Sequence, residues 1–390
     1  MKKWVLSLLC ALWAGGAFAQ ESGTKRETPV VEPPETFAMT LADGKLSGPG
    51  ADLILARLPK AQFILLGEDH GFADSPRLAL ALARAARKYG VTHHVAEIGP
   101  LSDEWAGAIL KEEGVDGLAK ALEGRPLALP FLTMREDAEL AAYFVKNAPR
   151  RGDAFWGVDQ EFIGSPLIHL EALLHLAPDD KATALAEALL TDEREAFASG
   201  SQEVLFLFTA TPETFSDLRA AFAGVKPALK VIDALEDSSA IYRAFNTGKN
   251  FASNTDRIDL IRRQFLDAYS KAPEEAPRVL FKMGAIHLGR GTTFLNTFDL
   301  GSLTEGMAAA NGLEVLRIAY WPLKGRVTQI TPFSDSAFQT VDYAPKKLTE
   351  DFGSFGLMPD MVAEQGFTVV PLRPVRRALE QKGLAGLSVL

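Results

Sequence analysis

The sequence predicts an α/β fold in which a mostly parallel central sheet is flanked by helices and carries a helical insertion. From Ala61 onward, strand-like and helix-like segments alternate, which is typical of a parallel sheet covered by helices. Apolar, strand-like runs end abruptly in ionisable residues, as at Glu68, Asp69 and His70. Between 166 and 275 the pattern becomes almost wholly helical. These observations divide the chain into a core and an insertion.

The first residues have the layout of a secretory signal peptide. Lys2 and Lys3 precede an apolar stretch, and Ala17-Phe18-Ala19 supplies the small residues of a cleavage site. We therefore expect residues 1–19 to be removed on export, which predicts a periplasmic or secreted protein. Residues 20–36 are rich in Glu, Thr and Pro and lack apolar periodicity, so they are predicted to form a disordered leader.

The composition narrows the classes of partner. The single cysteine, Cys10, lies in the expected leader, so the mature fold is expected to rest on its core without a disulfide. Loss of Lys2 and Lys3 changes the formal net charge from −9 to −11, and no Lys/Arg-rich block is present. We expect no nucleic-acid partner and no membrane insertion after signal cleavage. A small-molecule substrate is the expected partner, and no pattern indicates an oligomeric state.

The predicted core covers residues 37–165 and 276–390. Its first helix is the best delimited, with Ser75 as the expected N-cap, Pro76 at the first helical position and Gly90 just beyond the end. Strands are predicted at 61–67, 91–97, 153–158, 278–284, 314–319 and 367–372, and helices at 76–89 and 103–122.

The predicted helical insertion or cap covers residues 166–275. Asn254 is the expected N-cap of its last helix. Helices are predicted at 179–198, 213–223, 226–246 and 254–271.

Polar residues stand at the ends of four predicted strands. Because the carboxyl ends of parallel strands share one edge of a sheet, residues far apart in sequence are expected to converge there on one pocket. The residues concerned are Glu68, Asp69 and His70, then Glu97, then Asp159 and Gln160, and finally His287.

Two histidines and two glutamates in this set are compatible with two kinds of chemistry. In an acid/base system, one histidine removes a proton from water or an alcohol while a carboxylate orients its ring. In a metal site, Glu68, His70, Glu97 and His287 would surround a divalent cation with one open position. None of these residues has the close spacing of a dedicated metal motif, so the sequence favours the first interpretation and leaves the second open.

A covalent nucleophile has less support. Without Cys10 the chain has no cysteine, and it contains no Gly-x-Ser-x-Gly elbow. Ser75 is explained as a helix cap and Ser165 as the start of the helical insertion. Activated water is therefore the simpler nucleophile.

Three further polar residues are expected to have structural roles. His93 and His94 are neighbours in a predicted strand, so they point to opposite faces and are expected to pack in the core. Arg135 precedes two acidic residues and is expected to pair with local carboxylates.

Five short motifs occur in a fixed order between about residues 61 and 295. They are Gly67-Glu68-Asp69-His70-Gly71, Ala96-Glu97, Gly157-Val158-Asp159-Gln160, Asn254-x-x-Arg257 and Gly284-Ala285-Ile286-His287-Leu288-Gly289-Arg290-Gly291. This ordered set resembles the erythromycin esterase-like superfamily, whose wider circle includes ChaN-like haem-binding proteins and TraB/Tiki-type proteins. The last predicted strand, followed by Pro371, Arg373 and Pro374, also resembles the end of that superfamily.

The resemblance implies a hydrolytic centre on an α/β sheet with a helical insertion. In it His70 is the general base and Glu68 a supporting carboxylate, while Glu97 and His287 complete the pocket. Arg257 matches an arginine that faces such a site and stabilises a developing oxyanion, and Asp159 belongs to the same set. The chain departs from the common pattern at two positions: Ile258 replaces an acid, and Gln264 replaces an asparagine.

Three functional hypotheses follow from this set. The first is an exported hydrolase that cleaves an ester or similar acyl bond by His70-assisted attack of water, without a cofactor. The alternatives are a ChaN-like protein that binds haem or iron, and a metal-dependent peptidase of the Tiki/TraB type. The insertion carries no transferable specificity motif, so the sequence does not predict the substrate.

Overall fold

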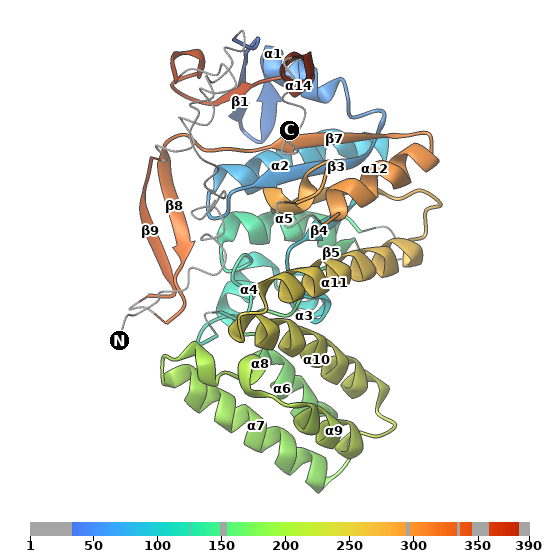
Figure 1. The fold of residues 1–390 in the computed structure, drawn as a ribbon, viewed down its shortest axis with the longest axis vertical. Coiled ribbons are helices and arrows are strands. Elements are labelled where there is room, and N and C mark those ends of the chain that lie inside the picture. Colours follow the sequence, from blue (N-terminus) through green and yellow to red (C-terminus); the bar gives the residue numbers. More distant parts are fainter. Residues whose placement is uncertain are drawn as a thin grey trace, which may run out of the picture. The chain divides into compact units, whose positions relative to one another are not determined.

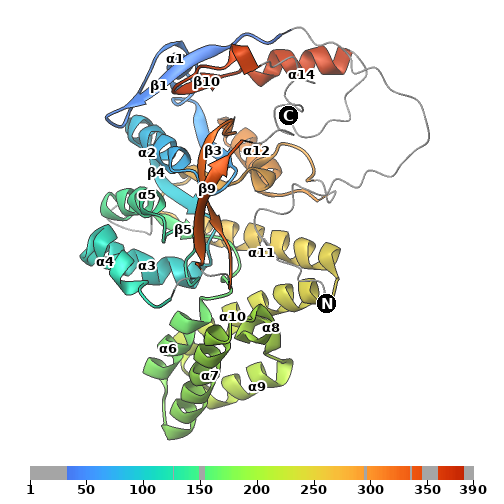
Figure 2. The same cartoon turned by 90° about the vertical axis from the view of Figure 1, so that its left-hand side faces the viewer.

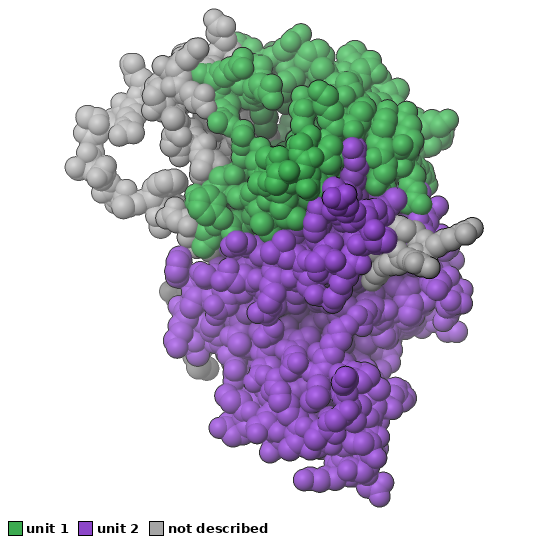
Figure 3. All heavy atoms as spheres, turned by 90° about the vertical axis from the view of Figure 1, so that its right-hand side faces the viewer, with its two compact units in different colours: residues 1–91, 284–329, 339–390 green, residues 92–283, 330–338 purple. Residues whose placement is uncertain are grey.

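A computed structural model describes residues 33–125, 127–148, 154–293, 297–333, 336–344 and 359–381. The expected signal peptide and most of the expected leader lie outside these residues. The chain divides into two compact units, which Figure 3 shows in different colours. Unit 1 comprises residues 1–91, 284–329 and 339–390, and unit 2 comprises residues 92–283 and 330–338.

Five strands form the central sheet in the order β5-β4-β6-β3-β7, which confirms the predicted α/β class. Figure 1 labels β3, β4, β5 and β7 of this sheet. The pairs β3–β7 and β4–β5 are both parallel. Every residue of β3 is buried, as expected for a strand covered on both faces. The five strands, each predicted to within about two residues, are β3 (Ala61–Glu68), β4 (Val91–Ala96), β5 (Phe155–Gly157), β6 (Arg278–Gly284) and β7 (Glu314–Ala319).

The prediction that segment 367–372 continues the central sheet is wrong. β10 (Phe367–Val369) instead pairs antiparallel with β1 (Phe37–Ala42), which also pairs with β2 (Lys45–Ser47). A short apolar run indicates a strand but not its partner, and here the partner lies near the other end of the chain. The strand is also shorter than predicted, because Pro371 supplies no N–H and helix α14 (Leu372–Gln381) begins directly after it.

Helix α2 (Asp74–Ala86) begins earlier than predicted. The Arg77 N–H donates to the Ala73 carbonyl, so Ala73 is the N-cap and Ser75 lies inside the first turn. The Ser75 side chain is fully buried, and its hydroxyl has no hydrogen-bond partner. The predicted end is confirmed: a short 3₁₀ turn, η2 (Arg87–Tyr89), runs to Gly90, whose φ of 90° suits a glycine. Unit 1 also contains α1 (Pro49–Leu55), η4 (Ala285–Leu288), α12 (Leu300–Ala310) and η5 (Pro359–Met361).

The single helix predicted over 103–122 is two helices, α3 (Pro100–Glu112) and α4 (Gly114–Ala121). Gly114 has a φ of 75°, a conformation that cannot continue a right-handed helix, so the chain changes direction there. Helix α5 (Arg135–Lys146) follows and packs against α3 and α4.

A run of helices fills the range predicted for the insertion (Figure 2). The central helix of this run is α10, which contacts α6, α8, α9 and α11. Asn254 is not the N-cap of α11, because the helix starts one turn earlier and the Asn254 amide donates to the Asn250 carbonyl within it. The helices are α6 (Pro166–Leu176), α7 (Asp180–Ala198), α8 (Phe206–Thr209), α9 (Pro212–Ala221), α10 (Lys226–Asn246) and α11 (Asn250–Lys271), with the 3₁₀ turn η3 (Gln202–Val204) after α7.

Strands β8 (Gly325–Ile330) and β9 (Phe338–Tyr343) form a separate two-stranded sheet that the sequence patterns did not indicate. Within the described ranges, none of the helices combines the length and apolar character needed to cross a membrane.

A buried carboxyl group on α7 predicts a pH-dependent stability. Glu193 is 2% exposed, and burial raises its pKa to about 8, although its Oε2 accepts the Phe206 N–H at 2.7 Å. Between the ordinary pKa of 4.5 and about 8, the unfolded chain loses this proton while the folded chain keeps it, so the free energy of unfolding falls as pH rises. We expect Glu193→Gln to remove most of this slope and to be more stable than wild type above pH 8, by on the order of 2–4 kcal/mol.

Urea unfolding of the two proteins across this pH range measures the difference. Glu195→Gln, an exposed change on the same helix, is the control and should leave the slope unchanged. An equal slope in wild type and Glu193→Gln would show that the carboxyl is already ionised at neutral pH.

Candidate active site

Glu68 and His70 form a buried pair at the carboxyl end of β3. His70 Nδ1 lies 2.8 Å from Glu68 Oε1. A neutral ring that donates from Nδ1 leaves Nε2 unprotonated, which is the form a general base needs. The structure therefore pairs the predicted base with its predicted carboxylate.

Gly67 lets this strand end approach the segment that carries the second histidine. A Cβ atom on Gly67 would lie 2.9 Å from the Ala285 Cα, so any side chain would push β3 and η4 apart. The two elements are in contact within unit 1. The glycine that opens the Gly-Glu-Asp-His motif thus has a packing role.

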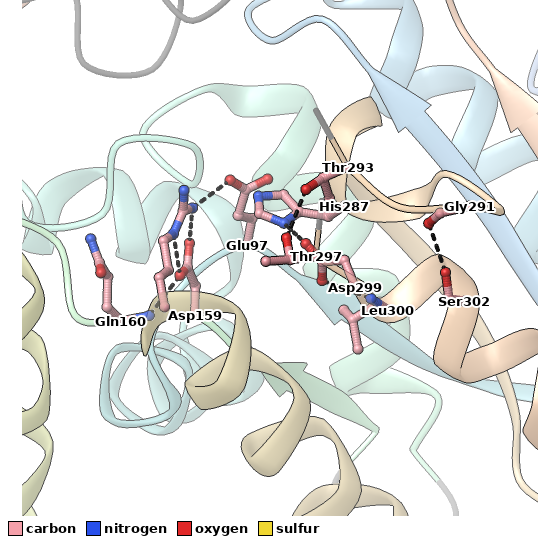
Figure 4. Close-up of polar contacts among 11 residues, drawn as sticks. Glu97, Asp159, Gln160, His287, Gly291, Thr293, Thr297, Asp299, Leu300 and Ser302 are labelled. Atoms are coloured by element: carbon pink, nitrogen blue, oxygen red, sulfur yellow. Dashed lines mark hydrogen bonds and ion pairs between the residues drawn. The ribbon is translucent and has the colours of Figure 1, made fainter. Parts of the chain in front are cut away.

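His287 is paired with Asp299, a residue that the strand-end pattern did not reveal (Figure 4). His287 Nδ1 lies 2.7 Å from Asp299 Oδ2, and both side chains are buried. The other oxygen, Oδ1, accepts the Leu300 N–H at 2.7 Å and so caps helix α12. An Asp directly before an apolar helical segment is a sequence signal for the cap, but it does not indicate the histidine partner.

Asp299→Asn should weaken the function of His287 without unfolding the protein. Asparagine still accepts the Leu300 N–H, but it removes the charge that stabilises a protonated His287 ring. We expect the pKa of His287 to fall and any His287-dependent turnover to drop by about 10–100-fold. A histidine NMR titration and steady-state kinetics measure the two effects. An unchanged titration would show that Asp299 is a helix cap only.

In unit 2, the partly buried Arg257 forms ion pairs with the buried carboxylates of Glu97 and Asp159, both of which are labelled in Figure 4. Its Nε donates to Asp159 Oδ1 at 2.9 Å and its Nη2 to Asp159 Oδ2 at 2.5 Å, which is a bidentate contact. The same Nη2 donates to Glu97 Oε1 at 2.8 Å. Burial alone would lower the pKa of Arg257, but the charges of Asp159 and Glu97 outweigh it and raise that pKa.

The surrounding elements fix this cluster in place. The Asp159 N–H donates to the Ile98 carbonyl at 2.8 Å, which joins the ends of β5 and β4. The Gln264 amide, in its hydrogen-bonded orientation, donates to the carbonyls of Val158 and Asp159. Gln264, one of the two departures from the common pattern, therefore supports the loop that carries Asp159.

A second buried network in unit 2 was not predicted. Glu161 Oε2 accepts the Ser102 hydroxyl at 2.5 Å and lies 2.8 Å from His169 Nε2, while Oε1 accepts the Leu101 N–H. Burial would raise the pKa of Glu161, but the charge of His169 and the hydrogen bonds from His169, Ser102 and Leu101 lower it overall. The same Nε2 faces both Glu161 and Ser102, so this network lacks the relay order of a nucleophilic triad.

The remaining polar residues fall into structural roles. His93 stacks on Trp156, and His94 stacks on Phe144 and Phe155 with its Nδ1 at 3.1 Å from the Leu280 carbonyl. Burial lowers the pKa of His94 to about 3, so its ring is neutral. The exposed Arg135 pairs with Asp116 and Glu139. Ser165 is fully buried ahead of α6, and its hydroxyl has no hydrogen-bond partner.

The predicted site residues therefore fall into three groups of paired side chains. Glu68 pairs with His70, His287 pairs with Asp299, and Arg257 joins Glu97 and Asp159. Among the described residues, no group of three or more His, Cys, Asp or Glu side chains is placed to hold a metal ion. The metal interpretation stays a prediction.

The fold is that of the erythromycin esterase-like proteins. A mutant of the erythromycin esterase EreC, in its open conformation, matches this chain with a TM-score of 0.55 and 14% identity, covering 82% of this chain and 86% of that one. A succinoglycan biosynthesis protein matches with a TM-score of 0.46 and 15% identity, covering 79% of this chain and 78% of that one.

ChaN of Campylobacter jejuni, described with cofacial haem binding, matches with a TM-score of 0.34 and 11% identity over 81% of this chain and 100% of that one. No protein-family model and no curated protein matches the sequence. The similarity to EreC, at 14% identity, establishes the fold and leaves the activity to the site.

Proposed function

We propose that this protein is an exported hydrolase that cleaves an ester or similar acyl bond of a small molecule. The observation that carries the proposal is the Glu68–His70 pair, a buried imidazole whose Nδ1 faces a carboxylate at 2.8 Å. A carboxylate on Nδ1 fixes the ring and favours the protonated form that arises when Nε2 accepts a proton.

In the proposed reaction, His70 Nε2 takes a proton from water as the water oxygen bonds to the acyl carbon. The resulting tetrahedral intermediate carries the negative charge on the former carbonyl oxygen. The bond from carbon to the leaving alcohol oxygen then breaks, and that oxygen receives the proton from the His70 ring. The products are a carboxylic acid and an alcohol, and His70 returns to its starting state.

The His287–Asp299 pair supplies a second imidazole oriented by a carboxylate in the same unit. We assign it a supporting acid/base or hydrogen-bonding role toward the substrate. The segments that carry the two pairs contact each other. Each pair buries charged or polar groups at a cost in desolvation free energy, so we infer that the pairs serve proton transfer and not structure alone.

Glu97, Asp159 and Arg257 are proposed to contribute through the guanidinium charge. Asp159 engages Arg257 through two nitrogens, so the charge is held in a fixed place as a catalytic cation must be. Oxyanion stabilisation by Arg257 remains the role that the family resemblance implies.

A substrate panel with a matched blank tests the proposal. Purified protein is assayed against ester and peptide substrates with and without a chelator, alongside His70→Ala. We expect ester hydrolysis that resists the chelator and disappears in the variant. Full turnover in His70→Ala would overturn the proposal. Loss of activity on chelation would instead favour the metal-dependent peptidase, and absorbance in the haem Soret region would favour the haem-binding alternative.

A further inference from the structure

The two-stranded sheet β8–β9 contacts the loop that carries His70. The Tyr343 hydroxyl, at the end of β9, donates to Asp69 Oδ2 at 3.1 Å. The Tyr343 ring also meets the Phe72 ring edge-on, with centroids 4.7 Å apart and planes at 79°. One residue therefore holds the chain on both sides of His70.

Strand β8 holds the same loop through its backbone. The Thr328 N–H donates to the Gly71 carbonyl at 3.0 Å. Gly71 has a φ of 92°, and a Cβ there would lie 2.2 Å from the Thr328 carbonyl oxygen. Only glycine permits this close approach, so the last glycine of the Gly-Glu-Asp-His-Gly motif is explained by docking of β8.

Asp69 places a second carboxyl group beside the Glu68–His70 pair. Burial, together with the charge of Glu68, raises the pKa of Asp69 overall, whereas the hydrogen bond from Tyr343, the charge of His70 and the His70 N–H favour the ionised form. Titratable groups from four elements lie around Asp69. Glu68 and His70 stand at the end of β3, Tyr343 on β9 and Tyr320 after β7. The fourth element is α2, where the charge of Asp74 acts on Tyr320 together with that of Asp69. Of these groups, Tyr343 donates a side-chain hydrogen bond to Asp69.

We propose that Tyr343 and Asp69 are positioning residues for the Glu68–His70 pair, and that β8–β9 is the element that supplies them. The hydrogen bond from Tyr343 favours the ionised Asp69 carboxylate and holds Oδ2 in place. The Asp69 charge in turn favours the protonated ring that forms during the reaction. This inference rests on the proposed function, because it assigns a purpose to the base that the function requires.

A histidine titration tests the inference without any substrate. The chain has six histidines, and the His70 signal is assigned by its loss in His70→Gln. Removing the nearby negative charge disfavours the protonated ring, so Asp69→Asn should lower the His70 titration midpoint by roughly half to one pH unit. Tyr343→Phe should lower it less, because the carboxylate remains but loses its donor.

Tyr143→Phe is the matched control. Tyr143 also makes an edge-on ring contact, with Phe144, but it lies on α5 in unit 2. The His70 titration midpoint in Tyr143→Phe should equal that of the wild type. If Asp69→Asn and Tyr343→Phe also leave the midpoint unchanged while both fold, the inference is wrong.

Kinetics separate failure of this inference from failure of the proposed function. On a substrate from the panel, Tyr343→Phe should lower kcat by roughly tenfold with little change in KM, and the acidic limb of its pH profile should move to lower pH. A purely structural role would not move that limb. An inactive His70→Ala with an unaltered Tyr343→Phe profile would retain the function and overturn the inference, whereas an active His70→Ala would overturn the function itself.

Discussion

His70→Gln should lower kcat/KM by about 10²–10⁴-fold, the range expected when a general base is removed. Glutamine fills similar space and still offers a polar group to Glu68, so the loss reports proton transfer more than packing. Glu68→Gln should lower kcat/KM by a smaller factor, because the ring keeps its proton acceptor but loses the charge opposite Nδ1. The double variant should be no worse than His70→Gln, since Glu68 acts through the histidine.

The control for this experiment is His175→Gln. His175 is exposed on α6, and its replacement should leave kinetics unchanged. Circular dichroism of each variant checks that the fold persists. Additive losses in the double variant would contradict the pairing, because they would mean that Glu68 and His70 act independently.

Arg257→Ala should destabilise the protein by about 3–5 kcal/mol, the cost of leaving buried charges without their partner. The change would leave both Glu97 and Asp159 buried and facing each other, with no cation between them. The loss should shrink at acidic pH, where these carboxylates accept protons. Urea unfolding at neutral and acidic pH measures the effect.

Arg263→Ala provides a matched comparison on the same helix. Arg263 pairs with Asp237 at 2.5 Å, but both side chains are at least half exposed. Its removal should cost no more than about 1 kcal/mol. Equal losses for the two variants would show that the Arg257 cluster is hydrated and contributes to stability as a surface ion pair does.

The sequence identified the strands of the central sheet because each is a short apolar run bounded by turn residues. It did not reveal β1, β2 or the β8–β9 pair, because most of their residues are exposed or only partly buried and they lack a continuous apolar run. Helix starts were less predictable than helix ends. Ser75 and Asn254 are good capping residues, yet in both cases the chain continues its helical turns further toward the N-terminus.

Candidate site residues could be proposed from the sequence where polar groups stand at strand ends. Glu68, His70, Glu97 and Asp159 were proposed in this way, and the motif comparison added Arg257. Their partners were harder to find, because Asp299 looks like an ordinary helix cap and Tyr343 is separated from Asp69 by 274 residues. Such contacts are set by tertiary packing, which leaves no local periodicity in the sequence.

The close approach at Gly67 has a consequence for directed evolution of this chain. The atom nearest to a Cβ at position 67 belongs to the backbone of residue 285, so shrinking the Ala285 side chain does not make room. No second-site change at 285 is therefore expected to rescue a substitution at 67, and the two positions should not covary. Mutant libraries aimed at new substrates should keep Gly67 unchanged and vary other positions.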